Sequence, residues 1–334
     1  MQRILVTGGA GYVGSVCVAQ LLARGFAVDV IDDVSTGHVE AVPPGAQFHR
    51  FDLGNREALA RLLASKQFDV AFHFAAKALV GQSMADPGIF FDVNVARSAA
   101  MLEVLREHRI RKFVFSSTAA VYGNPQTVPI PEDHPKNPVN PYGESKLMFE
   151  HILRWYAKAY DWSIVAFRYF NASGGAHEWG ESHEPETHII PILLHVASGR
   201  RQHFDLFGTD WPTPDGTCLR DYIHVSDIAD AHILALKKME SPGFHVYNIG
   251  TGQSHSVREV WRLAEEVTQK KIAAKESARR PGDPAILCAN PAQLKSDLGW
   301  TPKHTDLKPI IQGAWEWEQV QSKRTKSNAK AGSE

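Results

Sequence analysis

The sequence has little cysteine and no long hydrophobic run. Its three cysteines (Cys17, Cys218 and Cys288) lack Cys-x-x-Cys spacing, and their odd number argues against a disulfide framework. A reducing compartment is therefore expected. No stretch approaches the length of about 18 apolar residues that a membrane-spanning helix needs, and the apolar run at the N-terminus is too short for a signal peptide. These absences predict a soluble, cytoplasmic protein without a membrane partner.

The chain also lacks a surplus of either charge. It has 36 lysines and arginines against 37 aspartates and glutamates, for a formal charge of −1 at pH 7. A balanced charge gives no net attraction to nucleic acid or to an anionic membrane, so we expect no nucleic-acid partner. The hydrophobic fraction of 43% is ordinary for a globular protein, and 334 residues suggest about two domains.

Short runs rich in Val, Ile and Phe alternate with helical patterns through the first half of the chain. The runs, which we expect to form buried parallel strands, are residues 3–9, 26–33, 69–76, 112–118 and 163–173. The helical patterns are residues 13–25, 56–67, 95–109 and 143–160. This alternation predicts an α/β fold with a doubly wound parallel (Rossmann) sheet. Loops dominate from about residue 172, and two later helical patterns predict a smaller mixed α/β C-terminal lobe.

The segment ILVTGGAGYVGS places Gly8, Gly11 and Gly14 between a predicted strand and a predicted helix. A tight turn, close approach of the backbone to a pyrophosphate and close helix packing each need a residue without Cβ. The helix N-terminus offers free N–H groups and partial positive charge to phosphates. Asp32 ends the next strand, where a carboxylate accepts from an adenine-ribose diol and repels a 2′-phosphate. The pattern favours NAD over NADP.

Tyr142 and Lys146 stand four residues apart at the start of a predicted helix that follows Pro141. Residues i and i+4 share one face of a helix, although such pairs are common on any helix. A phenol with a pKa near 10 is a poor base at neutral pH. A nearby ammonium and a positive nicotinamide ring would favour the phenolate and make Tyr142 a usable acid/base.

Eight motifs then follow one another in a recognisable order: TGGAGYVGS, FSSTAAVYG, NPYGESK, RYFNAS, HEPETHIIP, DGTCLRDYIHVSDIADAH, YNIGTG and RRPGD. In this order they resemble the extended short-chain dehydrogenase/reductase family, and most closely its UDP-glucose 4-epimerases. The resemblance implies tightly bound NAD and redox-neutral interconversion of UDP-glucose and UDP-galactose. Hydride leaves C4 of the sugar, the 4-keto sugar rotates in the pocket, and the hydride returns to the opposite face.

The resemblance also implies roles for single residues. Tyr142 is the acid/base, Lys146 its partner, and Thr118 the hydroxyl that bridges substrate and tyrosine. The implied cofactor contacts are Gly8, Gly11, Tyr12, Val13, Gly14, Asp32, Asp33, Ser35, Thr36, Gly37, Asp52, Leu53, Phe74, Ala75, Ala76, Lys77, Asn94, Ser117, Tyr142, Lys146 and Phe170. Asp33 stands where relatives often carry asparagine, which weakens its assignment.

The implied substrate contacts are Thr118, Asn171, His188, Ile189, Arg220, Arg280, Asp283 and Leu287. Arginine suits a diphosphate because its planar fork donates two parallel hydrogen bonds. Asp283 can accept from a ribose hydroxyl. Leu287 occupies a position where side-chain size tunes the tolerance of the family for N-acetylated sugars.

The predicted domain organisation has three parts. Residues 1–171 form the NAD-binding Rossmann domain with the catalytic Thr/Tyr/Lys. Residues 172–320 form mainly a UDP-sugar-binding lobe, with some segments returning to the Rossmann sheet. Residues 321–334 lack apolar anchors and are expected to be a disordered tail. By resemblance, the helices at residues 95–109 and 143–160 pair across a homodimer.

Several other functions remain open from the sequence. A 4-epimerase of UDP-xylose/UDP-arabinose, UDP-glucuronate or UDP-N-acetylhexosamines would share every motif. A nucleotide-sugar dehydratase needs a carboxyl acid beside Thr118, and Ala119 and Ala120 cannot donate a proton. A non-catalytic NAD-sensing protein would be expected to lose the tyrosine or the lysine, and this chain keeps both.

Sixteen histidines raise the question of a metal site. The segment AHEWGESHEPETH contains His177, His183 and His188, and Glu178 follows His177. Their spacing fits no ligand pair on one face of a helix, such as His-Glu-x-x-His. We therefore expect no metal, and expect this loop to fold over the nucleotide of the substrate.

Overall fold

The structure is a computed structural model of the chain and describes residues 1–176 and 179–331. Its centre is a seven-stranded sheet in the order β11-β6-β5-β4-β1-β2-β3, in which every neighbouring pair is parallel. The strands are β1 (Arg3–Thr7), β2 (Ala27–Asp32), β3 (Gln47–Arg50), β4 (Val70–His73), β5 (Lys112–Thr118), β6 (Ser163–Tyr169) and β11 (Gly243–Ile249).

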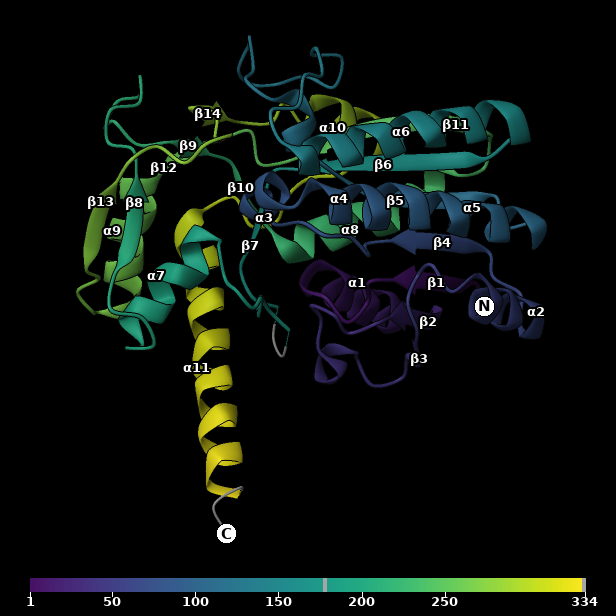
Figure 1. Cartoon of the computed structure of the whole chain (residues 1–334), viewed down its shortest axis with the longest axis horizontal. Helices are drawn as coiled ribbons and strands as arrows, with labels where there is room; N and C mark the ends of the chain where they lie inside the picture. The colour runs from purple at the N-terminus through teal and green to yellow at the C-terminus, as the bar shows by residue number, and fades with distance from the viewer. Residues whose placement is uncertain (177–178, 332–334) are drawn as a thin grey trace.

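Helices cover both faces of this sheet (Figure 1). One face packs against α1 (Tyr12–Ala23), α8 (Val225–Ala235) and α10 (Ala292–Leu298). The other face packs against α2 (Arg56–Ser65), α5 (Ser98–Glu107) and α6 (Pro141–Tyr160). Shorter helical segments connect them: η1 (Val39–Ala41), α3 (Val80–Ala85), α4 (Pro87–Phe91), the π-helical η2 (Asp92–Arg97), η3 (Ala119–Tyr122) and η4 (Leu236–Lys238). The predicted doubly wound parallel sheet is confirmed.

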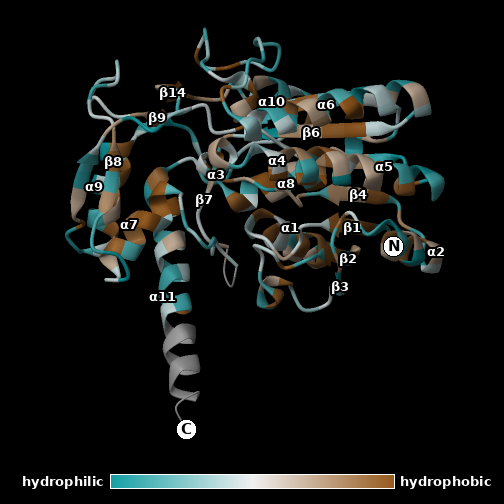
Figure 2. Cartoon of the chain, viewed as in Figure 1, coloured by the Kyte–Doolittle hydropathy of each residue, from teal (hydrophilic) through white to brown (hydrophobic). Residues whose placement is uncertain are grey.

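The central strands are mainly apolar in their middle residues because each of them is buried on both sides. In β1, Ile4 and Val6 enter the core of one face while Leu5 enters the core of the other, and all three are fully buried. Side chains alternate between the faces of a sheet, so a strand covered on both sides reads as a continuous apolar run. Figure 2 shows the same distribution, with hydrophobic colour along β1, β4 and β6.

The start of α6 is fixed by its own sequence. The Asn140 side chain accepts from the Gly143 N–H at 2.8 Å, and Pro141 occupies the first helical position. Both features are typical of helix N-termini. The helix ends where Asp161 adopts a left-handed conformation. Tyr142 is therefore the second residue of α6, and Lys146 lies one turn further on.

The C-terminal lobe has a separate hydrophobic core. It is built mainly from α7 (Ile189–Ala197), β8 (Phe204–Phe207), α9 (Val257–Thr268), β13 (Ala274–Ser277) and α11 (Leu307–Ala331). Short strands connect it with the large sheet: β7 (Asn171–Ser173), β9 (Leu219–Arg220), β10 (Tyr222–His224), β12 (His255–Ser256) and β14 (Ile286–Leu287). Among the described helices, none combines the length and apolarity needed to cross a membrane.

The chain crosses between the two parts more than once. After residue 172, α8, β11 and α10 all return to the large sheet, and β11 pairs with β6 along its full length. Residues 172–320 are therefore not one continuous lobe.

The predicted tail also differs from the structure, in which α11 continues through residue 331 and projects away from the body (Figure 1). Residues 321–331 contain no proline or glycine to stop a helix. Residues 332–334 lie outside the described part of the chain.

Candidate active site

The predicted cofactor residues follow the carboxyl ends of adjacent parallel strands. The glycine turn follows β1, Asp32 ends β2, Phe74 follows β4, and Thr118 ends β5. Because the strands are parallel and neighbouring, these segments meet at one edge of the sheet. This edge is where open α/β sheets bind their ligands.

The glycine turn is closely packed against its surroundings. Gly8 has a φ of +74°, and a Cβ on it would lie 2.4 Å from the Ala75 backbone nitrogen. A Cβ on Gly14 would lie 2.1 Å from the Gly8 carbonyl oxygen. Gly11 stands directly before α1, so the first N–H groups of the helix, on Tyr12 and Val13, lack helical acceptors. This turn has the close backbone packing and the free N–H groups that a phosphate-binding turn needs.

Asp32 connects the end of β2 with the glycine turn. Its carboxylate accepts from the Ala10 N–H at 3.0 Å and from the Val34 N–H at 2.9 Å. Burial raises the pKa of Asp32, and these two backbone hydrogen bonds oppose the rise. The carboxylate is thereby held in place, with lone pairs left to accept from a diol.

The loop after β2 brings further predicted cofactor residues together. The Asp33 side chain accepts from the Ser35 N–H at 2.8 Å, and the Lys77 ammonium lies 3.4 Å from the Ser35 hydroxyl. Asp33, Ser35 and Thr36 are exposed, whereas Gly37 packs against the Ala10 carbonyl. Polar groups therefore line the expected path of the adenosine.

Asn94 fixes the position of the segment Phe74–Ala75–Ala76–Lys77 by hydrogen bonds to its backbone. Its side chain accepts from the Lys77 N–H at 2.8 Å and donates to the Lys77 carbonyl at 2.9 Å. It also donates to the Ser145 hydroxyl at 3.0 Å, which ties the loop to α6. Asn94 is buried and lies in the π-helical turn η2, a conformation frequent at functional sites. Its polar atoms are thus committed to positioning the loop.

Asp52 and Leu53 are less accessible to a cofactor than the sequence suggests. Asp52 accepts from the Gly54 N–H at 2.7 Å and forms an ion pair with Arg97 at 2.5 Å. Leu53 is only 7% exposed and belongs to the core on the α2 side of the sheet. Any contact from Leu53 to a cofactor is therefore restricted to its backbone and the edge of its side chain.

The catalytic candidates Thr118 and Tyr142 are in contact. A hydrogen bond joins the Thr118 hydroxyl to Tyr142 and lowers the pKa of the phenol, but burial raises that pKa by more. The Thr118 hydroxyl also accepts from the Ala120 N–H at 3.1 Å, which orients it. The structure therefore brings these two hydroxyl groups together at the end of β5.

Lys146 is buried under this pair. Its ammonium donates to the Ser116 carbonyl at 2.8 Å and lies 4.8 Å from the centre of the Phe115 ring. Burial lowers the pKa of Lys146 to about 7, and the Glu150 carboxylate opposes that shift. The pKa of Tyr142 responds to burial and to Thr118, so the expected influence of Lys146 on the phenol remains a prediction.

The residues that the sequence predicts to bind the nucleotide of the substrate form a second group, next to the C-terminal lobe. The Arg280 guanidinium donates to both carboxylate oxygens of Asp283, at 2.9 and 3.3 Å, and Arg220 lies 4.0 Å from the same carboxylate. Asn171 is joined to this group because its N–H donates to the Asp221 carbonyl at 2.9 Å. Two arginine forks are thus gathered around one carboxylate.

Leu287 connects the nucleotide group with the catalytic group. It pairs with Arg220 in the β14–β9 ladder. It also packs on a buried cluster that contains Phe170, Ala119 and Leu147. Ala119 directly follows Thr118, so the two groups lie on either side of one small apolar cluster.

His188 and Ile189 begin α7 at the end of the loop that the sequence predicts over the nucleotide. The Nδ1 atom of the His188 ring lies within ion-pair distance of the Glu181 and Glu186 carboxylates. Burial by itself lowers the pKa of His188, but these carboxylates outweigh burial and hold it well above its usual value. His177 and Glu178 lie outside the described residues.

Comparison with known proteins agrees with this geometry. The NAD dependent epimerase/dehydratase family matches residues 4–250. A UDP-glucose 4-epimerase of Corynebacterium glutamicum is 45% identical over 313 residues, covering 94% of each chain. The chain belongs to the NAD dependent epimerase/dehydratase family. The family resemblance read from the sequence is confirmed.

Two solved structures of family members are similar over nearly the whole chain. A crystal structure of a UDP-glucose 4-epimerase has a TM-score of 0.93 and 43% identity, covering 96% of this chain and 98% of that one. A UDP-glucose 4-epimerase from Bifidobacterium longum, solved with NAD⁺ and UDP, has a TM-score of 0.92 and 32% identity at the same coverage. The family is NAD-dependent, and the glycine cradle with Asp32 beside it fits NAD.

A buried charge network lies behind the predicted catalytic residues, and the sequence did not indicate it. Glu150 and Arg168 form an ion pair at 2.6 Å, and each side chain is 2% exposed. The Ser117 hydroxyl donates to Glu150 at 2.6 Å, so it faces this network, and only the Ser117 backbone is left for the predicted cofactor contact. The available signal was the position of Glu150, four residues after Lys146 on the same face of α6.

A second missed residue is Phe207 at the end of β8. Its ring is 40% exposed, and the Arg280 guanidinium lies 5.6 Å from the ring centre. An exposed aromatic face next to an arginine fork is a suitable surface for a nucleobase. Nothing in the short run FDLF distinguishes it from an ordinary strand.

Proposed function

We propose that this chain is an NAD-dependent UDP-glucose 4-epimerase that interconverts UDP-glucose and UDP-galactose. The observation that carries the proposal is the arrangement around Leu287, which joins the Thr118–Tyr142 pair to the Arg220–Arg280 group through one apolar cluster. A sugar attached to a diphosphate needs these two groups at its two ends. The names and structures of the relatives support the same reaction.

Tyr142 takes the proton from the sugar 4-hydroxyl and returns it after the sugar has turned. Thr118 holds the same hydroxyl and keeps the phenol oriented through their hydrogen bond. NAD would supply a hydride acceptor and donor at C4 of the sugar, so the reaction would have no net redox change. The residues that would hold it are those of the glycine turn, Asp32 and the Phe74–Lys77 segment.

Lys146 supports proton transfer through its charge. Its pKa of about 7 places its titration near neutral pH, where a small change in local charge shifts its protonation. Glu150 opposes the lowering of this pKa, and Glu150 and Arg168 connect α6 with β5 and β6 through the Ser117 hydrogen bond and their ion pair. They are positioning residues because their contacts are to the protein.

The nucleotide end is held more firmly than the sugar. Arg220 and Arg280 donate to the diphosphate, Phe207 stacks on the uracil, and Asp283 accepts from the ribose. The sugar faces Leu287 and the Phe170 cluster, which are apolar and offer few fixed hydrogen bonds. Such a pocket lets the keto sugar rotate while the nucleotide stays bound.

The proposal includes a cytoplasmic homodimer that pairs through α5 and α6. On α6, Met148, Ile152 and Trp155 share one face, and Trp155 is 64% exposed while Met148 is 39% exposed. Large apolar groups at this spacing suit a helix pair between subunits. Light scattering of Trp155→Glu against the unmodified chain would test it, and an unchanged dimer mass would contradict it.

The test of the reaction uses purified protein, UDP-galactose and no added cofactor. We expect UDP-glucose by chromatography, without growth of the reduced-nicotinamide absorbance band. Lack of conversion, with and without added NAD, would reject the hexose reaction. UDP-arabinose, UDP-glucuronate and UDP-N-acetylglucosamine assayed in parallel separate a 4-epimerase of another sugar from a protein without this chemistry.

A further inference from the structure

The loop that precedes α7 gathers two histidines and two glutamates at one point. Glu181, His183, Glu186 and His188 each direct one ligand-type atom inward, and all four atoms lie within 4.8 Å of one another. The sequence reasoning tested the histidines for a helical spacing, and these residues lie on a loop. The loop folds back on itself, so residues two to seven apart converge without sharing a helix face.

The separations between the four atoms suit a small tetrahedral ion. His188 Nδ1 lies 2.5 Å from Glu181 Oε1 and 2.9 Å from Glu186 Oε1. His183 Nδ1 lies 3.1 Å from Glu181 Oε1 and 3.9 Å from Glu186 Oε2. With zinc–ligand bonds of about 2.0–2.1 Å, tetrahedral ligand atoms lie about 3.3 Å apart. These four contacts lie on both sides of this value, and the four ligand atoms lie within 4.8 Å of one another, so side-chain rotations are needed to close the site.

The charges and burial of the four side chains also favour a cation. The Glu181 side chain is 7% exposed and the Glu186 side chain 6% exposed, so two carboxylates are nearly buried side by side. The two imidazoles are more open, at 29% and 43% exposure, and leave a way in from solvent. Imidazole with carboxylate is a zinc-type ligand set and a poor one for magnesium.

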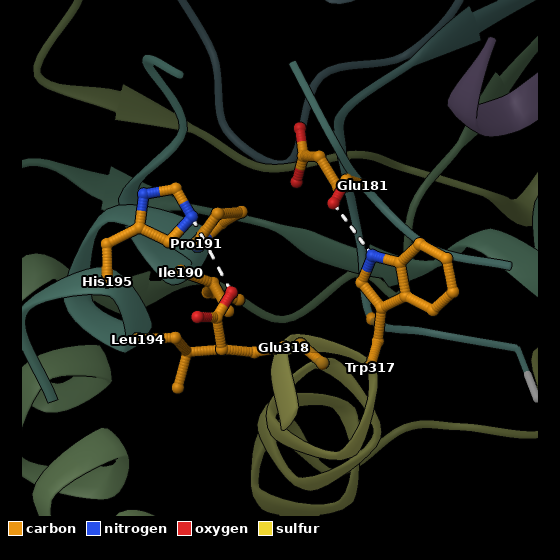
Figure 3. A pocket seen from close by; sticks show the side chains of 9 residues that line it. Glu181, Ile190, Pro191, Leu194, His195, Trp317 and Glu318 are labelled. Carbon is orange, nitrogen blue, oxygen red and sulfur yellow. Dashed lines mark hydrogen bonds and ion pairs between the residues drawn. The ribbon is translucent and has the colours of Figure 1, made fainter. Parts of the chain in front are cut away.

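The loop lies between the cofactor-binding turn and the C-terminal lobe. The His183 and Tyr12 rings pack edge to face, with their centres 6.4 Å apart. The His38 ring forms a hydrogen bond with the Ser182 carbonyl at 2.8 Å. From the other side, the Trp317 indole of α11 donates to the Glu181 carbonyl at 2.9 Å, next to a cavity of about 20 Å³ (Figure 3). An ion bound at the centre of this loop would stabilise its contacts with both the cofactor-binding turn and the C-terminal lobe.

We propose that Glu181, His183, Glu186 and His188 form a binding site for one zinc-class divalent cation, which fixes the loop between the glycine turn and α11. The site is structural because all four ligands come from protein, which leaves no open position for substrate. Binding of the cation can be measured without the epimerase reaction.

The first test measures metal content directly. Untagged protein is stripped with EDTA, dialysed against Zn²⁺ and analysed by mass spectrometry of the metal. We expect one zinc per chain and a higher Tm than in the stripped protein, since a ligand that binds only the native state stabilises it. Co²⁺ in place of Zn²⁺ should give the intense visible absorption of a tetrahedral site. No metal retained, or only the weak spectrum of octahedral Co²⁺, would overturn the proposal.

Matched variants separate this site from adventitious binding to other histidines. His183→Asn and Glu186→Gln should each weaken zinc binding about a hundredfold or more and remove the Tm increase. His195→Gln is the control, because His195 lies nearby and faces Glu318 at 3.7 Å, outside the cluster (Figure 3). It should keep one zinc per chain. Equal zinc binding by His183→Asn, with circular dichroism showing it folded, would contradict the proposal.

Discussion

The cofactor side and the substrate side of this molecule are built in different ways. On the cofactor side, long parallel strands such as β5 and β6 (seven residues each) end in short turns, and the backbone of those turns makes the site. On the substrate side, β9 and β14 have two residues each, and charged side chains from separate loops make the site. Backbone shape is a local property of the sequence, whereas convergence of distant side chains depends on the whole fold.

The largest expected effect separates chemistry from nucleotide binding. Tyr142→Phe removes the only hydroxyl of that side chain, so kcat for UDP-galactose should fall about a thousandfold, within the range for lost acid–base catalysis. Binding of UDP, measured by calorimetry, should stay within twofold because the arginine group is unchanged. Near-normal turnover would show that Tyr142 is not the acid/base.

The next effect tests the rigidity of the cofactor side. Glu150→Gln leaves the Arg168 guanidinium buried without its counter-ion, which should cost about 3–5 kcal/mol of unfolding free energy. Urea denaturation measures the loss. The double variant Glu150→Gln/Arg168→Met removes the stranded charge and should be less destabilised than the single variant. A single variant within about 1 kcal/mol of the unmodified chain would mean that the pair does not organise this side.

A smaller effect is expected on the substrate side, where the Arg280 side chain is 40% exposed. Arg280→Lys loses the planar fork that holds Asp283 and, in our proposal, the diphosphate. We expect KM for UDP-galactose to rise about tenfold, equivalent to about 1.4 kcal/mol, with kcat changed much less. Arg279→Lys is the matched control, because Arg279 lies over the Trp211 ring and pairs with Asp210. Equal KM changes in both variants would contradict the assignment.

The last prediction concerns the pH dependence of stability. In the folded chain the pKa of Lys146 is about 7, against an ordinary value of 10.5. Between these values the unfolded chain binds more protons than the folded chain, so this residue makes stability rise with pH, by at most about 1.4 kcal/mol per pH unit. Lys146→Met should therefore show a shallower rise than the unmodified chain in urea titrations at pH 7, 8 and 9. Parallel curves would show that burial does not lower the pKa of Lys146 in the folded chain.

Much of the cofactor side could be predicted because its signals are local. The apolar runs of β1, β2, β4, β5 and β6, the three glycines and the start of α6 at Pro141 all depend on neighbouring residues. The edge strand β11 was harder to predict, because only its partner β6 identifies it as part of the large sheet. Glu150 was also overlooked, because a glutamate on a helix is usually solvated until a buried partner such as Arg168 is found.

The sequence by itself determined the parallel Rossmann architecture, the preference for NAD and the placement of Tyr142 and Lys146 one turn apart on α6. Strand periodicity, turn geometry and the i,i+4 spacing act within a few residues of each other. Tertiary structure alone decided that Ser117 faces Glu150 and that four loop side chains from Glu181 to His188 converge. Those outcomes depend on long-range packing and on burial of charge, which no short stretch of sequence specifies.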